Sequence, residues 1–363
     1  MKGICCTESG RQVNNIERGE GLMTPLEAID KMAGQPVLVI GDMIADIYLY
    51  GTISRISREA PVLVLEQSRE NVVAGGAANV VNNAATLGGR VFAAGLTGDD
   101  SAADGLAEIL SRQQVDVSGF IRDVSRPTIA KTRVVAGGRT TVSQQIVRID
   151  RESREAMSQE CEKRLSDYLA AVLPQVKGIV LSDYGSGTIT DRLLQQIFDW
   201  SRPHGIPTIV DSRYDILRFK TVDYIKQNDA ELAAVIGHEL STEDELVAGG
   251  CRLLRLMSAK GALITRGEDG MTLFQRLEDG SQAADVELEG LRVKVTNIPV
   301  TDKSEVYDVS GAGDTCVAAV ILGLAAGIDP VLASQLSNEA SSISVRKMGT
   351  SVVYADELRK KYC

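Results

Sequence analysis

A polar, glycine-rich loop that runs directly into a long uncharged segment constrains this chain more than any other feature. The loop over 306–314 reads Val-Tyr-Asp-Val-Ser-Gly-Ala-Gly-Asp, and residues 315–327 carry no charge. This pattern predicts a buried helix whose first turn contains Gly311, Ala312 and Gly313. Backbone N–H groups in a first turn have no intrahelical partner, and small residues let an anion such as phosphate approach them.

Asp314 is unexpected in such a position, because a carboxylate repels phosphate. One interpretation is a catalytic base that takes the proton of an acceptor hydroxyl as this oxygen attacks a γ-phosphate. The alternative is an acidic residue that merely favours the positive end of a helix. The loop alone leaves both interpretations open.

Composition narrows the classes of function. The net charge of −10 over 363 residues argues against nucleic acid as a partner, but not against a nucleotide held with Mg²⁺. The six cysteines form no C-x-x-C pair, so we expect free thiols in a reducing cytoplasm. No stretch is apolar enough to span a membrane. Residues 1–24 lack the apolar core of a signal peptide, and we expect a loosely ordered extension before a folded domain over 25–363.

Strand and helix patterns alternate along most of the chain, which predicts an α/β fold with a mostly parallel sheet covered on both faces. We expect strands at about 37–42, 91–97, 178–182, 206–210, 222–226 and 260–264, followed by a β-rich stretch to 296. We expect helices at about 74–87, 99–114, 158–173, 188–202, 229–236, 242–258, 311–326 and 330–346, and a short one at the end. Two β-rich segments, 47–65 with short strands 47–50 and 62–65, and 128–150, interrupt the alternation. We assign both to a small β-sheet that acts as a lid.

Polar residues follow several of the predicted strands. In open α/β sheets, ligands bind beyond the carboxyl ends of the strands. The residues at these ends are Asp42, Asp183, Asp211 and Asn228. Each one alone fits a helix cap or a turn, but four at one edge favour a site.

Two segments offer groups to a nucleotide. Asn228 and Glu231 lie one turn apart at a helix start, where their oxygens suit Mg²⁺ bound through water, although a capping box fits equally well. Residues 265–270 follow an apolar strand and form either a simple turn or a row of backbone N–H groups for a nucleotide.

Other residues suit a sugar. Gly75 and Gly76 permit close approach of a ligand, and Asn79 can donate to and accept from hydroxyl groups, although tight packing explains these residues equally well. The lid segment adds three cations that are otherwise ordinary surface residues: Lys131, Arg133 and Arg148. No P-loop is present, no G-x-G-x-x-G follows a strand, and only two histidines occur, so those mechanisms are not expected.

The combination of motifs resembles the ribokinase (PfkB) family of sugar kinases. The resemblance rests on Gly75-Gly-x-x-Asn79, Asn228-x-x-Glu231 and the loop 308–314, and it covers about residues 36–358. Within the family it is closest to the D-glycero-D-manno-heptose 7-phosphate kinases, which are similar in the segments 41–48, 54–62, 75–80, 131–134, 148–150, 181–184 and 349–351. The bifunctional relatives also carry a nucleotidyltransferase, for which we expect no room in this chain.

The resemblance implies a ribokinase-like three-layer α/β/α fold and a role for each motif. Asp314 would be the base, and the amides of Gly311, Ala312 and Gly313 an anion hole. Asn228 and Glu231 would organise Mg²⁺ and ATP, and Asp308 would lie near a possible monovalent cation such as K⁺. The nucleotide would be lined by Thr265, Gly267, Gly270 and Asn338. The acceptor would be bound by Asp42, Gly75, Gly76, Asn79, Lys131, Arg133, Arg148 and Asp183.

Two departures concern the acceptor. The heptose kinases carry lysines where this chain has Ser186 and Arg213, and lysines there would meet phosphate charge. The sequence therefore predicts an ATP-dependent sugar kinase with heptose 7-phosphate, phosphorylated at its anomeric hydroxyl, as the leading acceptor. The alternatives are another sugar or a nucleoside, or a non-catalytic binding protein, for which Asp314 would have little use. Unpaired edges of the lid also predict a homodimer that forms through it.

Overall fold

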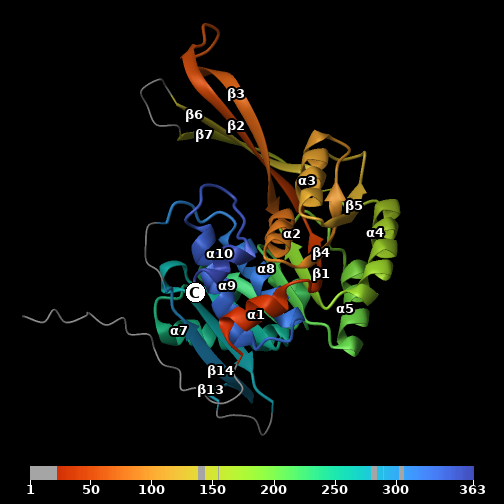
Figure 1. Ribbon diagram of the computed structural model, residues 1–363, viewed down its shortest axis with the longest axis vertical. Coiled ribbons are helices and arrows are strands. Elements are labelled where there is room, and N and C mark those ends of the chain that lie inside the picture. Colours follow the sequence, from red (N-terminus) through yellow and green to blue (C-terminus); the bar gives the residue numbers. More distant parts are fainter. Residues whose placement is uncertain (1–22, 138–143, 154, 279–283, 289, 302–305) are drawn as a thin grey trace, which may run out of the picture.

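The computed structural model describes residues 23–137, 144–153, 155–278, 284–288, 290–301 and 306–363 (Figure 1). Within these residues the central sheet has ten strands in the order β13-β14-β12-β11-β10-β9-β8-β1-β4-β5. In this order, the seven neighbouring strands from β11 through β5 run parallel to one another. Strands β12, β14 and β13 add antiparallel neighbours beyond β11. The bounds are β1 Pro36–Gly41, β4 Arg90–Thr97, β5 Asp116–Arg122, β8 Gly178–Asp183, β9 Thr208–Ser212, β10 Tyr224–Asn228, β11 Gly261–Thr265, β12 Met271–Arg276, β13 Val286–Leu288 and β14 Leu291–Ile298.

Helices cover both faces of this sheet, and each face has its own apolar core. One core includes α1 Pro25–Met32, α2 Ala77–Thr86, α3 Ser101–Arg112, α8 Ala312–Ala325, α9 Pro330–Ser344 and α10 Ala355–Arg359. The other includes α4 Gln159–Val172, α5 Asp191–His204, α6 Asp229–Ile236 and α7 Glu243–Met257. Single 3₁₀ turns occupy Leu173–Gln175, Ile216–Phe219 and Gly267–Asp269. None of the helices in the described residues is long and apolar enough to cross a membrane.

The sequence explains this arrangement at its centre. In β1, Val37 and Val39 belong to one core and Leu38 and Ile40 to the other, and all four are fully buried, as expected for a parallel strand covered on both faces. Helix α8 is buried over ten consecutive residues from Asp314 to Gly323, so a charged side chain would find no water on any side. The predicted three-layer α/β/α class is confirmed.

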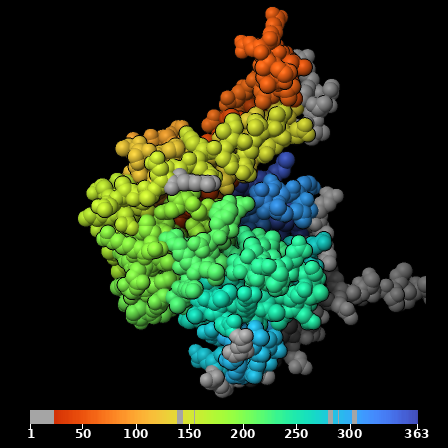
Figure 2. All heavy atoms as spheres, turned by 180° about the vertical axis from the view of Figure 1, so that it is seen from behind, coloured from red at the N-terminus to blue at the C-terminus, as the bar shows by residue number. Residues whose placement is uncertain are grey.

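A second, four-stranded sheet projects from one end of the molecule in the order β3-β2-β6-β7 (Figures 1 and 2). We call it the small sheet. Its strands are β2 Met43–Ile56, β3 Leu63–Gly76, β6 Ile129–Gly137 and β7 Gln144–Arg151. The expected strands 47–50 and 62–65 were much too short. Both faces of β3 meet solvent over residues 66–71, so the polar residues there show no alternation that would reveal a strand.

Other boundaries also differ from the prediction. The helix expected from residue 74 begins only at Ala77, because β3 continues through Gly76, whose φ of +53° ends the strand. The sequence analysis missed α1 and also β5, whose Asp116, Ser118 and Gly119 interrupt its apolar pattern. The expected extension over residues 1–24 lies almost entirely outside the described residues.

Asp42 ties the carboxyl ends of β1 and β8 together. Its buried carboxylate accepts hydrogen bonds from the backbone N–H groups of Tyr184, Ser186 and Thr188, at 2.8, 3.1 and 3.4 Å. Burial raises the pKa of Asp42, and the three N–H groups oppose that rise. This single side chain therefore fixes the backbone of the segment that follows β8.

We predict that Asp42→Asn destabilises the fold. The amide keeps the shape but turns an N–H₂ group toward backbone N–H donors, and a buried donor without an acceptor costs about 1–3 kcal/mol. The urea-unfolding midpoint should therefore fall, whereas Asp167→Asn, at an exposed ion pair on α4, should leave it in place. An unchanged midpoint for Asp42→Asn would mean that this carboxylate does not hold the segment.

Candidate active site

Asp314 lies in the first turn of α8, and only 6% of its surface is exposed. The Nδ2 of Asn79, on α2, donates a hydrogen bond to its Oδ2 at 2.8 Å. The hydroxyl of Tyr184, just after β8, donates to its Oδ1 at 2.9 Å. Both carboxylate oxygens thus face hydrogen-bond donors from other elements of the fold.

The surroundings of Asp314 suit a group that exchanges a proton near neutral pH. Burial raises the pKa of Asp314 to about 6, and the charge of Asp211 adds to the rise. The hydrogen bonds from Asn79 and Tyr184 act in the opposite direction, because they stabilise the charged form. A carboxylate with a pKa close to the working pH is an effective general base.

The glycines before Asp314 allow two elements to approach the start of α8. Gly311 adopts a φ of +81°, and a Cβ there would lie 2.5 Å from Nδ2 of Asn79. A Cβ on Gly313 would lie 2.6 Å from Nζ of Lys226. Within the described residues no side chain caps this end of α8. The N–H of Ala312 donates to the carbonyl of Val309 at 3.3 Å, so an anion at this turn would have to replace that long bond.

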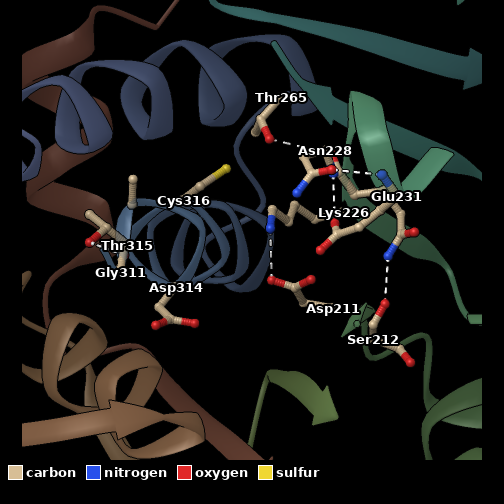
Figure 3. A network of polar contacts seen from close by, with 12 residues as sticks. Asp211, Ser212, Lys226, Asn228, Glu231, Thr265, Gly311, Asp314, Thr315 and Cys316 are labelled. Carbon is tan, nitrogen blue, oxygen red and sulfur yellow. Dashed lines mark hydrogen bonds and ion pairs between the residues drawn. The ribbon is translucent and has the colours of Figure 1, made fainter. Parts of the chain in front are cut away.

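Lys226 is a buried cation beside this helix start (Figure 3). It reaches from β10, and its Nζ lies 2.9 Å from Oδ2 of Asp211, at the end of β9. Burial would lower the pKa of Lys226, but the charges of Asp211 and Glu231 and the hydrogen bond to Asp211 together outweigh it and raise this pKa. The sequence analysis noted Asp211 and missed Lys226. The signal was present, since an inward lysine in a strand of a covered sheet is rare unless it has a partner.

The pair at the start of α6 forms a complete capping box. Asn228 N–H donates to Oε2 of Glu231 at 2.8 Å, and Glu231 N–H donates to Oδ1 of Asn228 at 2.7 Å. Burial raises the pKa of Glu231, while the charge of Lys226 opposes the rise. The capping alternative therefore accounts for the spacing of the two residues, and their role toward Mg²⁺ stays a prediction.

A cavity of about 380 Å³ opens beside the start of α8. It contains the four residues predicted to line a nucleotide, Thr265, Gly267, Gly270 and Asn338. Its remaining walls are mostly apolar or small: Glu268, Met271, Val300, Val306, Val309, Ala312, Gly313, Ser341, Ser342, Val345 and Arg346. Such a lining suits a flat heteroaromatic ring, and Gly313 links the cavity to the anion-binding turn.

The residues predicted to bind the sugar separate into two groups. Asn79 contacts Asp314 directly, and the Nζ of Lys131 lies 5.4 Å from the ring centre of Tyr184. Gly75 and Gly76 are explained by packing, because a Cβ at either position would meet Asp46 or Ile44 at less than 3 Å.

The other predicted sugar residues already have partners. Arg133 pairs with Asp46 at 2.7 Å, and Thr350 donates to the other oxygen of Asp46 at 2.9 Å. Arg148 is half exposed and pairs with Asp150 on its own strand. The buried Asp183 accepts from the hydroxyl of Ser212 and from the N–H of Gly185.

Asp308 lies in the loop before α8 and is held by backbone donors. It accepts from the N–H of Ser310 at 2.8 Å and from that of Gly349 at 3.0 Å. Burial would raise its pKa, but these hydrogen bonds outweigh it and lower the pKa of Asp308. This carboxylate therefore stays charged, as the neighbour of a cation would have to be.

Solved structures share this architecture. Phosphofructokinase-2 from Escherichia coli, in complex with substrates and products, superposes with a TM-score of 0.69 at 19% identity, covering 91% of this chain and 98% of that one. The ribokinase of Arabidopsis thaliana, complexed with ribose and ATP, gives 0.66 at 19% identity, covering 90% and 98%. At these identities the likeness establishes the fold, which is ribokinase-like.

Sequence relatives are closer. A protein named bifunctional protein HldE from Geobacter sulfurreducens is 39% identical over 322 residues, which are 88% of this chain and 61% of that protein. One of the same name from Bradyrhizobium diazoefficiens is 37% identical over 348 residues, 93% of this chain and 66% of that protein. The chain thus spans less than two thirds of the length of these relatives. The profile described as pfkB family carbohydrate kinase matches residues 35–356, and the chain belongs to that family.

Proposed function

We propose that this protein transfers the γ-phosphoryl group of ATP to a sugar hydroxyl, with the anomeric hydroxyl of D-glycero-D-manno-heptose 7-phosphate as the leading acceptor. The observation that carries the proposal is the position of Asp314, a buried carboxylate in the first turn of α8 whose oxygens accept from Asn79 and Tyr184. A protein that only binds a sugar or a nucleotide would have no need of a base there. We place the enzyme in the cytoplasm, where ATP is available.

ATP would lie with its base in the 380 Å³ cavity and its γ-phosphate at the first turn of α8. The amides of Gly311, Ala312 and Gly313 would stabilise the charge on the transferred group. The ammonium of Lys226, next to Gly313, would add a fixed positive charge at the same place.

Two metal ions suit the residues present. The carboxylate of Glu231, together with Asn228, offers the oxygen donors that Mg²⁺ prefers and would hold it through water, where it would neutralise phosphate charge. Asp308, which stays charged, would lie near a monovalent cation such as K⁺.

The chemical step requires a single proton transfer to the protein. Asp314 takes the proton of the acceptor hydroxyl as its oxygen forms a bond to the γ-phosphorus. The bond from this phosphorus to the bridging oxygen breaks, and ADP leaves with the electron pair. Asn79 holds the other carboxylate oxygen and orients the base.

We predict that Asp314→Asn lowers kcat by a factor on the order of 10²–10⁴, the usual contribution of a positioned base. Since the base must be deprotonated and burial raises its pKa to about 6, kcat/KM of the unaltered enzyme should fall as the pH drops below about 6. Coupled-enzyme assays over pH 5–9 measure both effects. ATP should still protect the variant against thermal unfolding. Near-normal turnover by Asp314→Asn would remove this residue from the mechanism.

The motifs that resemble those of the heptose 7-phosphate kinases, together with the cations near Tyr184, support a phosphorylated heptose. Arg133 is already neutralised by Asp46, whereas Lys131 lies over the ring of Tyr184, whose hydroxyl contacts the base, and neither Lys131 nor Tyr184 lines the nucleotide cavity. Arg213 follows β9 and is exposed near the same ring. Lys131 and Arg213 are therefore better candidates than Arg133 for the distal phosphate.

We predict that Lys131→Met raises KM for a 7-phosphorylated heptose by about ten- to a hundredfold, the value of one charged hydrogen bond. KM for the same sugar without the phosphate should change little. Lys163→Met, which removes an exposed lysine on α4, serves as the matched control. If the unaltered enzyme prefers the unphosphorylated sugar, the heptose 7-phosphate assignment is wrong, while the kinase assignment is kept.

We further propose that two copies associate through their small sheets. Strands β3 and β7 are its edges. Four large apolar side chains on its strands are 46–66% exposed, Ile56, Leu63, Val147 and Ile149, and Val62, just before β3, is 56% exposed. Val147 and Ile149 alternate along β7 and so share one face. A projecting sheet with such a face gains stability when a second copy covers it (Figure 2).

This arrangement predicts a dimer at micromolar concentration in sedimentation velocity. The double substitution of Val147 and Ile149 by Ser should shift the equilibrium toward monomer. Val124→Ser, which removes an 86% exposed apolar residue outside the small sheet, should not. A monomer in the unaltered protein, with substrate present, would contradict the proposal.

A further inference from the structure

We propose that the hydroxyl of Tyr184 occupies the place of the acceptor hydroxyl on Asp314 and keeps water away from the base until a sugar replaces it. The inference rests on the proposed kinase function and adds a residue that controls access to the base. Its starting point is that each carboxylate oxygen of Asp314 accepts a hydrogen bond from the protein: Oδ2 from Asn79 and Oδ1 from Tyr184.

The two donors are not equivalent. Asn79 belongs to the first turn of α2, within the core of the molecule, and it also accepts from Nδ2 of Asn83 at 3.0 Å. Tyr184 follows β8, and its side chain is only partly buried. Of the two, the contact of Tyr184 is therefore the one that a ligand can replace without disturbing the core.

The Tyr184 hydroxyl resembles a sugar hydroxyl in what it offers to the carboxylate. Each presents one O–H donor, and the 2.9 Å between the two oxygens is an ordinary hydrogen-bond distance. Burial and the charge of Asp314 raise the pKa of Tyr184 well above its usual value, so this hydroxyl keeps its proton and acts as a donor. While it is in place, it fills the lone-pair position of Oδ1 that faces Tyr184, and a water molecule cannot use that position.

Hydrogen bonds hold the backbone at Tyr184, whereas its side chain donates to Asp314 and lies near Lys131. The carboxylate of Asp42 holds the N–H groups of Tyr184 and Ser186. The flanking Gly185 and Gly187 have φ values of +81° and +80°, which other residues rarely adopt. On the solvent side, the ammonium of Lys131 lies 5.4 Å from the centre of the ring. A rotation of the ring about its side-chain bonds would free Asp314 without moving the segment.

A kinase needs such a device because water is itself an acceptor of the γ-phosphoryl group. In that side reaction Asp314 would take a proton from water, the water oxygen would bond to the γ-phosphorus, and ADP and phosphate would form. A donor that covers the base in the absence of sugar suppresses this hydrolysis of ATP. The sugar, held by many contacts, can displace Tyr184, whereas a single water molecule cannot.

The test is Tyr184→Phe, which removes only the hydroxyl. We expect sugar-independent ATP hydrolysis to rise about three- to tenfold and KM for the sugar to fall about two- to tenfold, because one net hydrogen bond no longer has to be broken. The acid limb of the kcat/KM profile should move to higher pH, since Asp314 loses a bond that lowers its pKa. The matched control is Tyr168→Phe on α4, which removes a hydroxyl that has no hydrogen-bond partner among the described residues.

Each other outcome has its own meaning. A higher KM would show that Tyr184 holds the sugar instead of yielding to it, and unchanged hydrolysis and KM would reduce it to a structural partner of Asp314. Either result overturns the inference.

Adding Asp314→Asn to Tyr184→Phe should abolish the gain in hydrolysis, and persistence of that gain would contradict the route through the base. Tyr184→Leu provides a second variant without the hydroxyl if the phenylalanine variant is poorly folded. Failure of the unaltered enzyme to phosphorylate any sugar would instead refute the proposed function.

Discussion

The close approach of α2 and β10 to the glycines at the start of α8 is the contact on which the site depends. Asn79 and Lys226 lie so near Gly311 and Gly313 that a single methyl group at either glycine would collide with them. The same contact brings an amide and a buried ammonium next to Asp314, from elements that are distant in the sequence. Both the close packing and the proposed chemistry therefore require a residue without a side chain at positions 311 and 313. Helix propensity explains neither glycine.

Much of this could be predicted because the informative patterns are local. The uncharged segment after Asp314 indicated a helix buried on all sides, and the apolar run of β1 indicated a strand covered on both faces. The four residues assigned to the nucleotide line one cavity because they follow β11 or lie on α9, which meet beside α8. Spacing along the chain was enough in these cases.

What the sequence did not reveal depends on pairing between distant segments. The place of Lys226 in a predicted strand hinted at a partner, but only the pairing of β9 with β10 identifies this partner as Asp211, at 2.9 Å. Arg133 looked like an ordinary surface cation, but the register of β2 and β6 pairs Asp46 with Lys131, two residues before Arg133, and the Arg133 side chain reaches Asp46 at 2.7 Å. Asp42 matched a sugar ligand by motif, yet its carboxylate holds the backbone of the segment after β8. Long-range partners decide the role of a charged side chain, and they are the least visible feature of a single sequence.

The balance of charge at the site explains why a lysine is buried there. Before ATP binds, the ammonium of Lys226 is compensated by Asp211, with Glu231 as a further negative neighbour. Nearby Asp314 adds another carboxylate, so an incoming triphosphate would meet a surplus of negative charge if Lys226 were neutral. Removing Lys226 would also leave the mostly buried carboxylate of Asp211 without its partner, which is more costly than losing an exposed pair. In the proposed kinase the lysine would thus compensate Asp211 before ATP binds and attract the phosphates of ATP, and the Asp211 carboxylate favours its protonated form for both tasks.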